Sequence, residues 1–262
     1  MESNAGRFVW YELMTTDPKA AMQFYTDVVG WTTQAFGDEG GDDPYTMWVG
    51  SQGPLGGVMN LPDKAKKMGA PPHWMSNVEV SNVDEAVAKT KRMGGQVFEE
   101  PMDIPKVGRV AVIADPQGAP IGLFKPIDAM QSHDKSKAGE FTWSELVTTD
   151  HEAAFGFYAA LCGWERISEF DMGPMGKYLL FGQNGKPHGG MMTKSKDMPM
   201  PPAWLYYVHV DDLEAAVERA KAKGAKLLNG PMAVPTGERI AQLMDPQGAA
   251  FALHASAPVK SA

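Results

Sequence analysis

The chain has 262 residues but only one cysteine, Cys162, so no internal disulfide can form. The absence of disulfides is typical of a reducing compartment, and we expect a cytoplasmic protein. Cys162 follows the apolar run of an expected helix, which favours packing over a reactive thiol. No apolar run approaches the roughly 20 residues of a membrane span. Residues 1–7 also lack the apolar core of a signal peptide, so we expect no membrane partner.

Positive charge and nucleotide-binding loops are also scarce. The chain has 24 Lys and Arg against 32 Asp and Glu, a formal net charge of −8, and its positive residues are scattered. A nucleic-acid-binding surface is therefore not expected. Neither a Gly-x-x-x-x-Gly-Lys-Ser/Thr loop nor a Gly-x-Gly-x-x-Gly turn after a strand occurs. The lone cysteine and the scattered histidines indicate no nucleophile–base arrangement.

What the sequence does contain is a long repeat. The segment 8–17 returns as 141–150, a shift of 141 − 8 = 133 residues. Further along the chain the shift becomes 245 − 115 = 130, because a loop of the second half is three residues shorter. The other matched pairs are Phe24-Tyr25 with Phe157-Tyr158, Gly30-Trp31 with Gly163-Trp164, Gly56-Gly57 with Gly189-Gly190, and Asp115-Pro116-Gln117-Gly118 with Asp245-Pro246-Gln247-Gly248. The chain is therefore one unit of about 125 residues used twice, a domain-scale duplication.

Each half is predicted to contain two modules of strands and one helix. Residues 8–15 alternate as a strand does, and Asp17 with Pro18 then suits the start of a helix that ends at Gly30. The first module continues with strands at 45–50 and 56–61 and a polar loop at 64–72. The second is expected as a strand at 74–80, a helix at 83–93, and strands near 96–99, 109–114 and 120–125. The Asp-Pro-Gln-Gly segments have the residue types of a turn.

This order of motifs, present twice, resembles the vicinal oxygen chelate superfamily, which includes glyoxalase I, extradiol dioxygenases and bleomycin-binding proteins. The form Trp-x-Glu-Leu-x-Thr-x-Asp at the front of each half is similar to the tandem glyoxalase-related branch. The resemblance implies an α+β fold of two tandem domains, whose four βαβββ modules form open, concave half-barrel sheets. We expect domains at 1–126 and 139–262, joined by a linker at 127–138.

The resemblance also implies where metal ligands would lie. Metal-using members place a His or Gln seven residues before the aspartate that precedes the helix, and a Glu beyond the Asp-Pro-x-Gly turn. In this sequence the corresponding positions hold Trp10, Met75, Gly122, Trp143, Leu205 and Ala252. None of these side chains ligates a divalent ion. We therefore expect no metal cofactor at the family's site.

The alternation of each strand then predicts which side chains face inward. The expected ligand-binding residues are Trp10, Glu12, Trp143, Glu145, Tyr207, His209 and His254. Glu12 and Glu145 are candidate catalytic residues, because a carboxyl beside an indole should have a raised pKa. The alternative is that each pairs with an arginine, for which Arg109 and Arg239 are candidates, or with backbone amides, and holds the sheet.

The histidines distinguish the two halves. His209 and His254 occur only in the second half, where the first half has Glu79 and Phe124. With Glu145 they form the alternative metal set, of the 2-His-1-carboxylate type. A neutral imidazole that bonds a ligand or a core partner is the other interpretation. The histidines at 73, 133 and 151 lie in loops or at a helix start, and we expect them to be solvated.

The sequence therefore predicts a glyoxalase- or bleomycin-resistance-like protein that binds a small apolar or aromatic molecule. Sequestration and metal-independent chemistry both fit. The alternative is a metal-dependent lyase or dioxygenase of glyoxalase type with a relocated site in the second domain. Whether the protein is an enzyme stays open, as does its state as a monomer, in which the two halves form an internal pseudo-dimer, or a homodimer.

Overall fold

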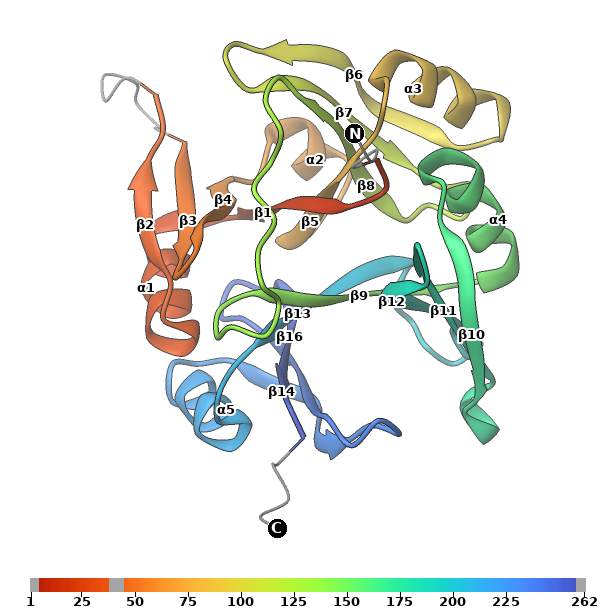
Figure 1. The fold of residues 1–262 in the computed structure, drawn as a ribbon. Coiled ribbons are helices and arrows are strands. Elements are labelled where there is room, and N and C mark those ends of the chain that lie inside the picture. Colours follow the sequence, from red (N-terminus) through yellow and green to blue (C-terminus); the bar gives the residue numbers. More distant parts are fainter. Residues whose placement is uncertain (1–4, 38–44, 258–262) are drawn as a thin grey trace. The chain divides into compact units, whose positions relative to one another are not determined.

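The computed structural model describes residues 5–37 and 45–257, and both halves of this part contain the same succession of strands and long helices, apart from one short helix in the first half and one 3₁₀ turn in the second (Figure 1). The first half consists of β1 (Phe8–Thr15), α1 (Pro18–Val29), β2 (Thr32–Ala35), β3 (Thr46–Gly50), β4 (Gly53–Asn60), α2 (Asp63–Lys67), β5 (His73–Glu79), α3 (Val83–Arg92), β6 (Gln96–Ile104), β7 (Gly108–Ala114) and β8 (Pro120–Pro126). The second consists of β9 (Phe141–Thr148), α4 (His151–Cys162), β10 (Glu165–Asp171), the 3₁₀ turn η1 (Gly173–Met175), β11 (Lys177–Gln183), β12 (Lys186–Thr193), β13 (Ala203–His209), α5 (Leu213–Ala222), β14 (Lys226–Ala233), β15 (Arg239–Met244) and β16 (Ala250–Ala255).

The strands form two eight-stranded sheets of the same topology. Their orders are β2-β3-β4-β1-β5-β8-β7-β6 and β10-β11-β12-β9-β13-β16-β15-β14. In each sheet β1 or β9 pairs in parallel with β4 or β12, and the hairpins around them are antiparallel. Neither sheet closes into a barrel. The predicted α+β class with four repeated modules is therefore confirmed.

The ends of α1 and α4 follow from short-range chemistry. Asp17 precedes α1 and accepts the backbone N–H of Ala20 at 3.0 Å, while Pro18 occupies the first turn. Gly30 ends the helix with φ of 90°, a left-handed conformation that favours glycine. Asp150 and Gly163 repeat this arrangement at α4. Both predicted helices are confirmed, with the aspartate and the glycine at their expected places.

Some local predictions differ from the structure. The segment expected as a polar loop at 64–72 begins within the five-residue helix α2, whose residues are not buried. Strand β2 was not anticipated, because Thr32–Ala35 is exposed throughout and has no apolar alternation. Strand β6 extends to Ile104, beyond the apolar residues at its start, and is half-exposed. In each case backbone hydrogen bonds, rather than an apolar pattern of side chains, define the element.

The chain folds into two compact units that combine modules from both halves. Unit 1 consists of residues 1–10, 75–131 and 143–205, and unit 2 of residues 11–74, 132–142 and 206–262. Within unit 1, α3 lies beside α4, and within unit 2, α1 lies beside α5 (Figure 1). The predicted boundaries at 126 and 139 follow the sequence repeat and stay a prediction.

Unit 2 is organised by a buried Tyr–Asp–Trp cluster. The hydroxyl of Tyr25 on α1 donates to Asp245 Oδ2 at 3.0 Å and accepts from Trp74 Nε1 at 2.8 Å. The other carboxylate oxygen of Asp245 accepts backbone N–H groups at 247, 248 and 249. Burial raises the pKa of Asp245, and burial with this carboxylate raises that of Tyr25 well above its ordinary value. The Phe24-Tyr25 motif of the first half is therefore hydrogen-bonded to the Asp-Pro-Gln-Gly turn of the second half.

Unit 1 contains the same cluster with the halves exchanged. Tyr158 on α4 donates to Asp115 Oδ2 at 3.2 Å and accepts from Trp204 Nε1 at 3.3 Å. Asp115 Oδ1 accepts the backbone N–H groups of residues 117 and 119. Burial also raises the pKa of Asp115. The repeated motifs are thus structural, and each joins two modules that are distant in sequence.

Two further expectations concern the composition. Cys162 is buried, and burial raises the pKa of its thiol to about 12, so the expected packing role is confirmed. Among the residues that the structure describes, no helix combines the length and the apolar character needed to cross a membrane.

Candidate functional site

The strands of unit 2 have one face packed on helices and an opposite face that carries polar side chains. Phe251 on β16 packs against Phe24 and Tyr25 of α1, with ring centroids 5.8 and 5.3 Å apart. Alternation turns Ala252 and His254 to the opposite face. These two pair in parallel with residues 207 and 209 of β13, which therefore share that face. We call the face opposite the helices the open face of a module.

On the open face of β1, a glutamate and a tyrosine are hydrogen-bonded. Tyr11 stacks on Phe141 at 3.7 Å between centroids and faces the core, so Glu12 points to the open face. The Tyr45 hydroxyl donates to Glu12 Oε1. The tyrosine lies over Gly57, the residue paired with Glu12, where an added Cβ would come within 2.0 Å of the hydroxyl. The absence of a side chain at Gly57 thus makes room for the pair.

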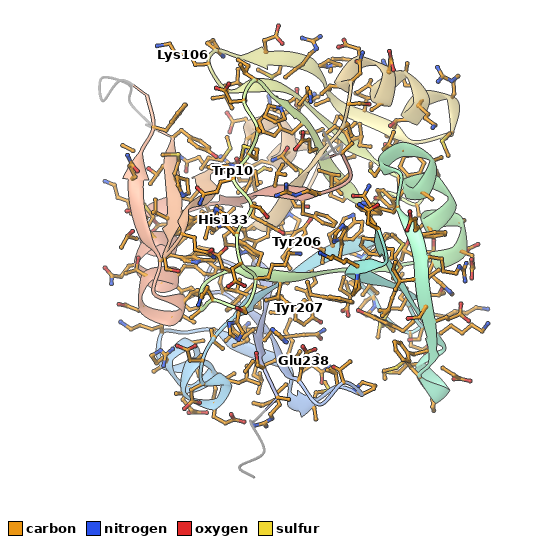
Figure 2. All side chains as sticks on the ribbon, viewed as in Figure 1. Trp10, Lys106, His133, Tyr206, Tyr207 and Glu238 are labelled. Carbon is orange, nitrogen blue, oxygen red and sulfur yellow. The ribbon has the colours of Figure 1, made fainter. Side chains whose placement is uncertain are left out.

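Unit 1 has the equivalent arrangement on β9, extended by a tryptophan. Tyr178 donates its hydroxyl hydrogen to Glu145 Oε2 at 2.9 Å and accepts from Trp143 Nε1 at 2.9 Å. Gly190 pairs with Glu145, and an added Cβ there would lie 2.2 Å from the tyrosine ring. The expected site residues Trp143 and Glu145 are thus brought together. Trp10, their counterpart on β1, is half-buried (Figure 2).

Sequence reasoning missed the two tyrosines, Tyr45 and Tyr178. A signal was present, because 178 − 45 = 133, the shift of the first part of the repeat. The two arginines considered as alternative partners of the glutamates pair with other carboxylates. Arg109 pairs with Asp84 at 2.7 Å and with Asp103 at 2.9 Å, and Arg239 pairs with Glu214.

The open face of β13 and β16 carries the two histidines that distinguish the halves. His209 is 6% exposed, and its ring centroid lies 5.6 Å from that of His254. His254 Nε2 lies 3.6 Å from Glu238 Oε1, and His209 Nε2 lies 3.3 Å from Ser256 Oγ. Among the described residues, neither buried Nδ1 atom has a hydrogen-bond partner. Both imidazoles therefore keep one ring nitrogen for another group.

The surroundings of His254 favour the neutral form of its imidazole. Burial lowers the pKa of His254, the Glu238 carboxylate raises it in part, and His209 lowers it further. Nearby, Gln242 Nε2 donates to the Tyr207 hydroxyl at 2.8 Å. Figure 2 shows Tyr207 and Glu238 in the C-terminal module, drawn in blue. The expected site residues Tyr207, His209 and His254 thus lie in one module.

The other histidines correct an expectation. His151 is 8% exposed and its Nδ1 lies 2.7 Å from Thr193 Oγ1. His133 Nδ1 lies 2.8 Å from Glu140 Oε2, a buried carboxylate. At His73, Nδ1 lies 2.7 Å from the carbonyl oxygen of residue 71, and burial lowers the pKa. The prediction that these three are solvated was wrong for His151, which is buried. His73 and His133 are half-buried, and Nδ1 of each of the three lies within hydrogen-bonding distance of a partner.

The positions that the family uses for metal ligands do not fit a metal here. Their side chains are indole, thioether, aliphatic or absent, and the space above Gly122 is filled by Asn77, whose Oδ1 would lie 2.1 Å from an added Cβ. Elsewhere in the described ranges, the one group with three close ligand atoms is His151, Glu152 and Glu169. Its carboxylates are already paired with Arg166 and Lys177. The alternative set of Glu145, His209 and His254 draws on both units and stays a prediction.

Comparisons with known proteins agree with this architecture. The 33% identical "Putative glyoxylase CFP32" of Mycobacterium tuberculosis matches over 250 residues, covering 95% of this chain and 94% of the relative. The "Anthracycline biosynthesis protein DnrV" of Streptomyces peucetius is 30% identical over 260 residues, with coverage of 95% and 92%.

Solved structures show the same fold at low identity. A Mn(II)-bound glyoxalase from Novosphingobium aromaticivorans has a TM-score of 0.66 at 16% identity and covers 97% of this chain and 83% of its own. A variant of homoprotocatechuate 2,3-dioxygenase from B. fuscum has a TM-score of 0.68 at 14% identity, with coverage of 97% and 72%. The family profile matches residues 7–123 and 140–253, so the resemblance stated from the sequence is confirmed. The chain belongs to the Glyoxalase/Bleomycin resistance protein/Dioxygenase superfamily.

Proposed function

We propose that the protein binds a small aromatic molecule with hydroxyl or carbonyl groups on its open faces, without the family's metal. The observation that carries this proposal is the hydrogen-bonded Glu–Tyr pair, which occurs in each half. In both halves the glutamate lies on the first strand, two residues after a tryptophan. Aromatic rings provide stacking area, and a carboxylate held by a tyrosine provides a fixed hydrogen-bond acceptor. Apolar walls with a few placed polar groups are typical of sites for organic ligands.

The Glu–Tyr pair is suited to recognition of an aromatic hydroxyl. Tyr178 fixes the Glu145 carboxylate at 2.9 Å, and Trp143 in turn fixes the tyrosine at 2.9 Å. Because the three groups restrain one another, little ordering of side chains is needed when a ligand binds. A carboxylate has about four lone-pair sites, so it can accept a ligand hydroxyl in addition to the tyrosine.

Two relatives are named for the biosynthesis of anthracyclines, which are fused-ring aromatic compounds with hydroxyl and carbonyl groups. Their names support an aromatic ligand of this class. The name of other relatives, "Putative glyoxylase CFP32", supports the glyoxalase-type enzyme of the alternative. We favour binding without a metal because the side chains at the family's ligand positions offer no oxygen or nitrogen donor for a hard or borderline divalent ion.

A titration with alizarin and with its parent anthraquinone, which lacks hydroxyl groups, tests the proposal. The full chain should bind both, as measured by quenching of tryptophan fluorescence and by equilibrium dialysis. Tyr178→Phe and Glu145→Gln should weaken alizarin binding about 3- to 10-fold and leave anthraquinone binding nearly unchanged, because only the hydroxylated ligand loses a hydrogen bond. Glu218→Gln, at an exposed ion pair on α5, is the control.

Equal affinities of all variants for both ligands would contradict the role of the Glu–Tyr pair. The alternative function predicts a different result with metal. After chelator treatment, stoichiometric uptake of Mn²⁺, Ni²⁺ or Fe²⁺ and metal-dependent turnover of the hemithioacetal of methylglyoxal and glutathione would overturn binding without a metal.

A further inference from the structure

The open faces of the second modules differ between the halves at a set of positions that are close in space. At the shift of 209 − 79 = 130, His209 replaces Glu79 and His254 replaces Phe124. At the same shift, Glu238 replaces Gly108 and Ser256 replaces Pro126. In the second half these four residues form two polar side-chain contacts, His254 Nε2 with Glu238 and His209 Nε2 with Ser256. The duplicated copy has none of these four residues.

In the first half, packing excludes a side chain at the position of Glu238. A Cβ on Gly108 would lie 2.6 Å from the ring of Phe124 and 2.4 Å from the backbone oxygen of Lys125. Phe124 is 5% exposed, so its ring cannot move aside cheaply. The aromatic ring and the glycine are therefore one packed pair. In the second half the same two positions hold an imidazole and a carboxylate, 3.6 Å apart.

This carboxylate–imidazole pair has the arrangement of a general base. When Glu238 accepts the Nε2 hydrogen of His254, the tautomer of the neutral ring leaves Nδ1 as a lone-pair acceptor. That Nδ1 atom is buried and, within the described part of the chain, has no partner. Burial and His209 lower the pKa of His254, which keeps the ring neutral and able to take a proton.

The second imidazole lies beside the first. His209 is held on β13 by two backbone hydrogen bonds of 2.8 Å, from Gly139 N to its carbonyl and from its N–H to the carbonyl of Glu140. Its own Nδ1 is also buried and, among described residues, lacks a partner. The ring nitrogens of the two histidines and the Glu238 carboxylate do not all lie close enough together to hold one metal ion, so the arrangement favours proton chemistry over a metal site.

We propose that His254, positioned by Glu238, is a general base that isomerises the bound aromatic ketone, with His209 as the hydrogen-bond donor to the oxygen. The proposal rests on the proposed function, because it requires the ligand to bind. In the forward step a C–H bond conjugated with a carbonyl breaks. The proton goes to His254 Nδ1, and the electron pair moves through the conjugated system to the carbonyl oxygen, which His209 Nδ1–H stabilises. Return of the proton to carbon or to oxygen gives a tautomer, so no oxidant or cofactor is needed.

Anthrone is a suitable probe, because its methylene hydrogens are conjugated with its carbonyl and exchange through the enol form. The experiment measures exchange of these hydrogens with D₂O by proton NMR under nitrogen, and measures anthrone binding separately by equilibrium dialysis. The full chain should accelerate exchange over buffer alone, with or without chelator. His254→Gln should lower the rate by about 100-fold or more while affinity changes less than about threefold.

Glu238→Gln should lower the rate by about 10-fold and move the pH profile, because the carboxylate acts through the imidazole. A purely structural glutamate would leave the profile in place. Glu79→Gln, at the position equivalent to His209 in the first half, is the matched control and should exchange at the wild-type rate.

The outcomes separate the two proposals. If anthrone binds but the protein does not accelerate exchange, or if His254→Gln exchanges at the wild-type rate, the general base is wrong and ligand binding stands. If neither anthrone nor alizarin binds, the proposed function fails and the general base fails with it. Loss of exchange on chelator treatment, restored by a divalent metal, would overturn a proton transfer that needs no metal.

Discussion

Tyr25 in unit 2 and Tyr158 in unit 1 occupy equivalent places, and each donates to the aspartate of a turn from the other half of the sequence. The open faces of the same units differ. The module with Asp245 carries His209 and His254, whereas the module with Asp115 carries a glutamate and a phenylalanine. The duplicated Tyr–Asp clusters therefore maintain the fold, whereas two of the residues that differ between the halves, His209 and His254, have a buried Nδ1 without a partner among the described residues. A function that belongs to one half should be sought at these differing positions.

The strongest test of the shared cluster is to remove its carboxylates one at a time. Asp245→Ala leaves three backbone N–H groups and the Tyr25 hydroxyl without their acceptor, and Asp115→Ala leaves two backbone N–H groups and the Tyr158 hydroxyl without theirs. Each substitution should lower the free energy of unfolding by about 3 kcal/mol or more, because each unpaired buried donor costs about 1–3 kcal/mol. Urea denaturation followed by tryptophan fluorescence measures both.

Tyr25→Phe and Tyr158→Phe are the matched comparisons and should cost about 2 kcal/mol each, because each removes a hydroxyl that donates to the aspartate and accepts from a tryptophan. A large cost in one unit with none in the other would show that the two clusters are not equivalent, despite their shared geometry.

Much of the shared architecture could be predicted from the sequence. The N-cap Asp17 and the C-cap Gly30 act within a few residues, so their chemistry is visible locally. The repeat then extends each local prediction to the other half. That Tyr25 meets Asp245 could not be predicted, because 220 residues separate them and only the packing of modules brings them together.

The open faces were predicted in part. Strand alternation placed Glu12, Glu145 and the two histidines where the structure has them. Tyr45, Tyr178 and Glu238 were missed because each comes from a neighbouring strand or turn. The two tyrosines lie beside the glutamates only because the strand register places a glycine, Gly57 or Gly190, beneath each ring. Periodicity along one strand contains no information on its neighbour's register.

A second prediction introduces the same residue at two equivalent positions of the open faces. Gly108→Ala should destabilise unit 1 by about 1–3 kcal/mol, because the new Cβ would strike Phe124 and the backbone. Glu238→Ala should change the free energy of unfolding by about 0.5 kcal/mol or less, since its side chain is 46% exposed. Urea denaturation of the two variants at pH 7.5 compares them. Equal costs would mean that the two turns are packed alike.

The smallest expected effect is a dependence of the free energy of unfolding on pH, caused by His254 in the second half. The pKa of His254 is lowered in the folded protein, so the unfolded chain binds a proton more readily. Above the ordinary histidine pKa of about 6.5 both states are neutral there and nothing is lost. As the pH falls through that value towards the lowered one, the unfolded state is favoured and stability declines.

His254→Phe, which installs the residue of the first half, should remove part of this decline. The test compares the free energies of unfolding of the variant and the wild type at several pH values between 7.5 and 5. Other groups, including His73, whose pKa is also lowered by burial, titrate in both proteins and cancel in the difference. The difference should therefore shift in favour of the variant as the pH falls. A constant difference would show that His254 takes up its proton equally well in the folded state, and the imidazole would then be too accessible to water to serve as the buried base of unit 2.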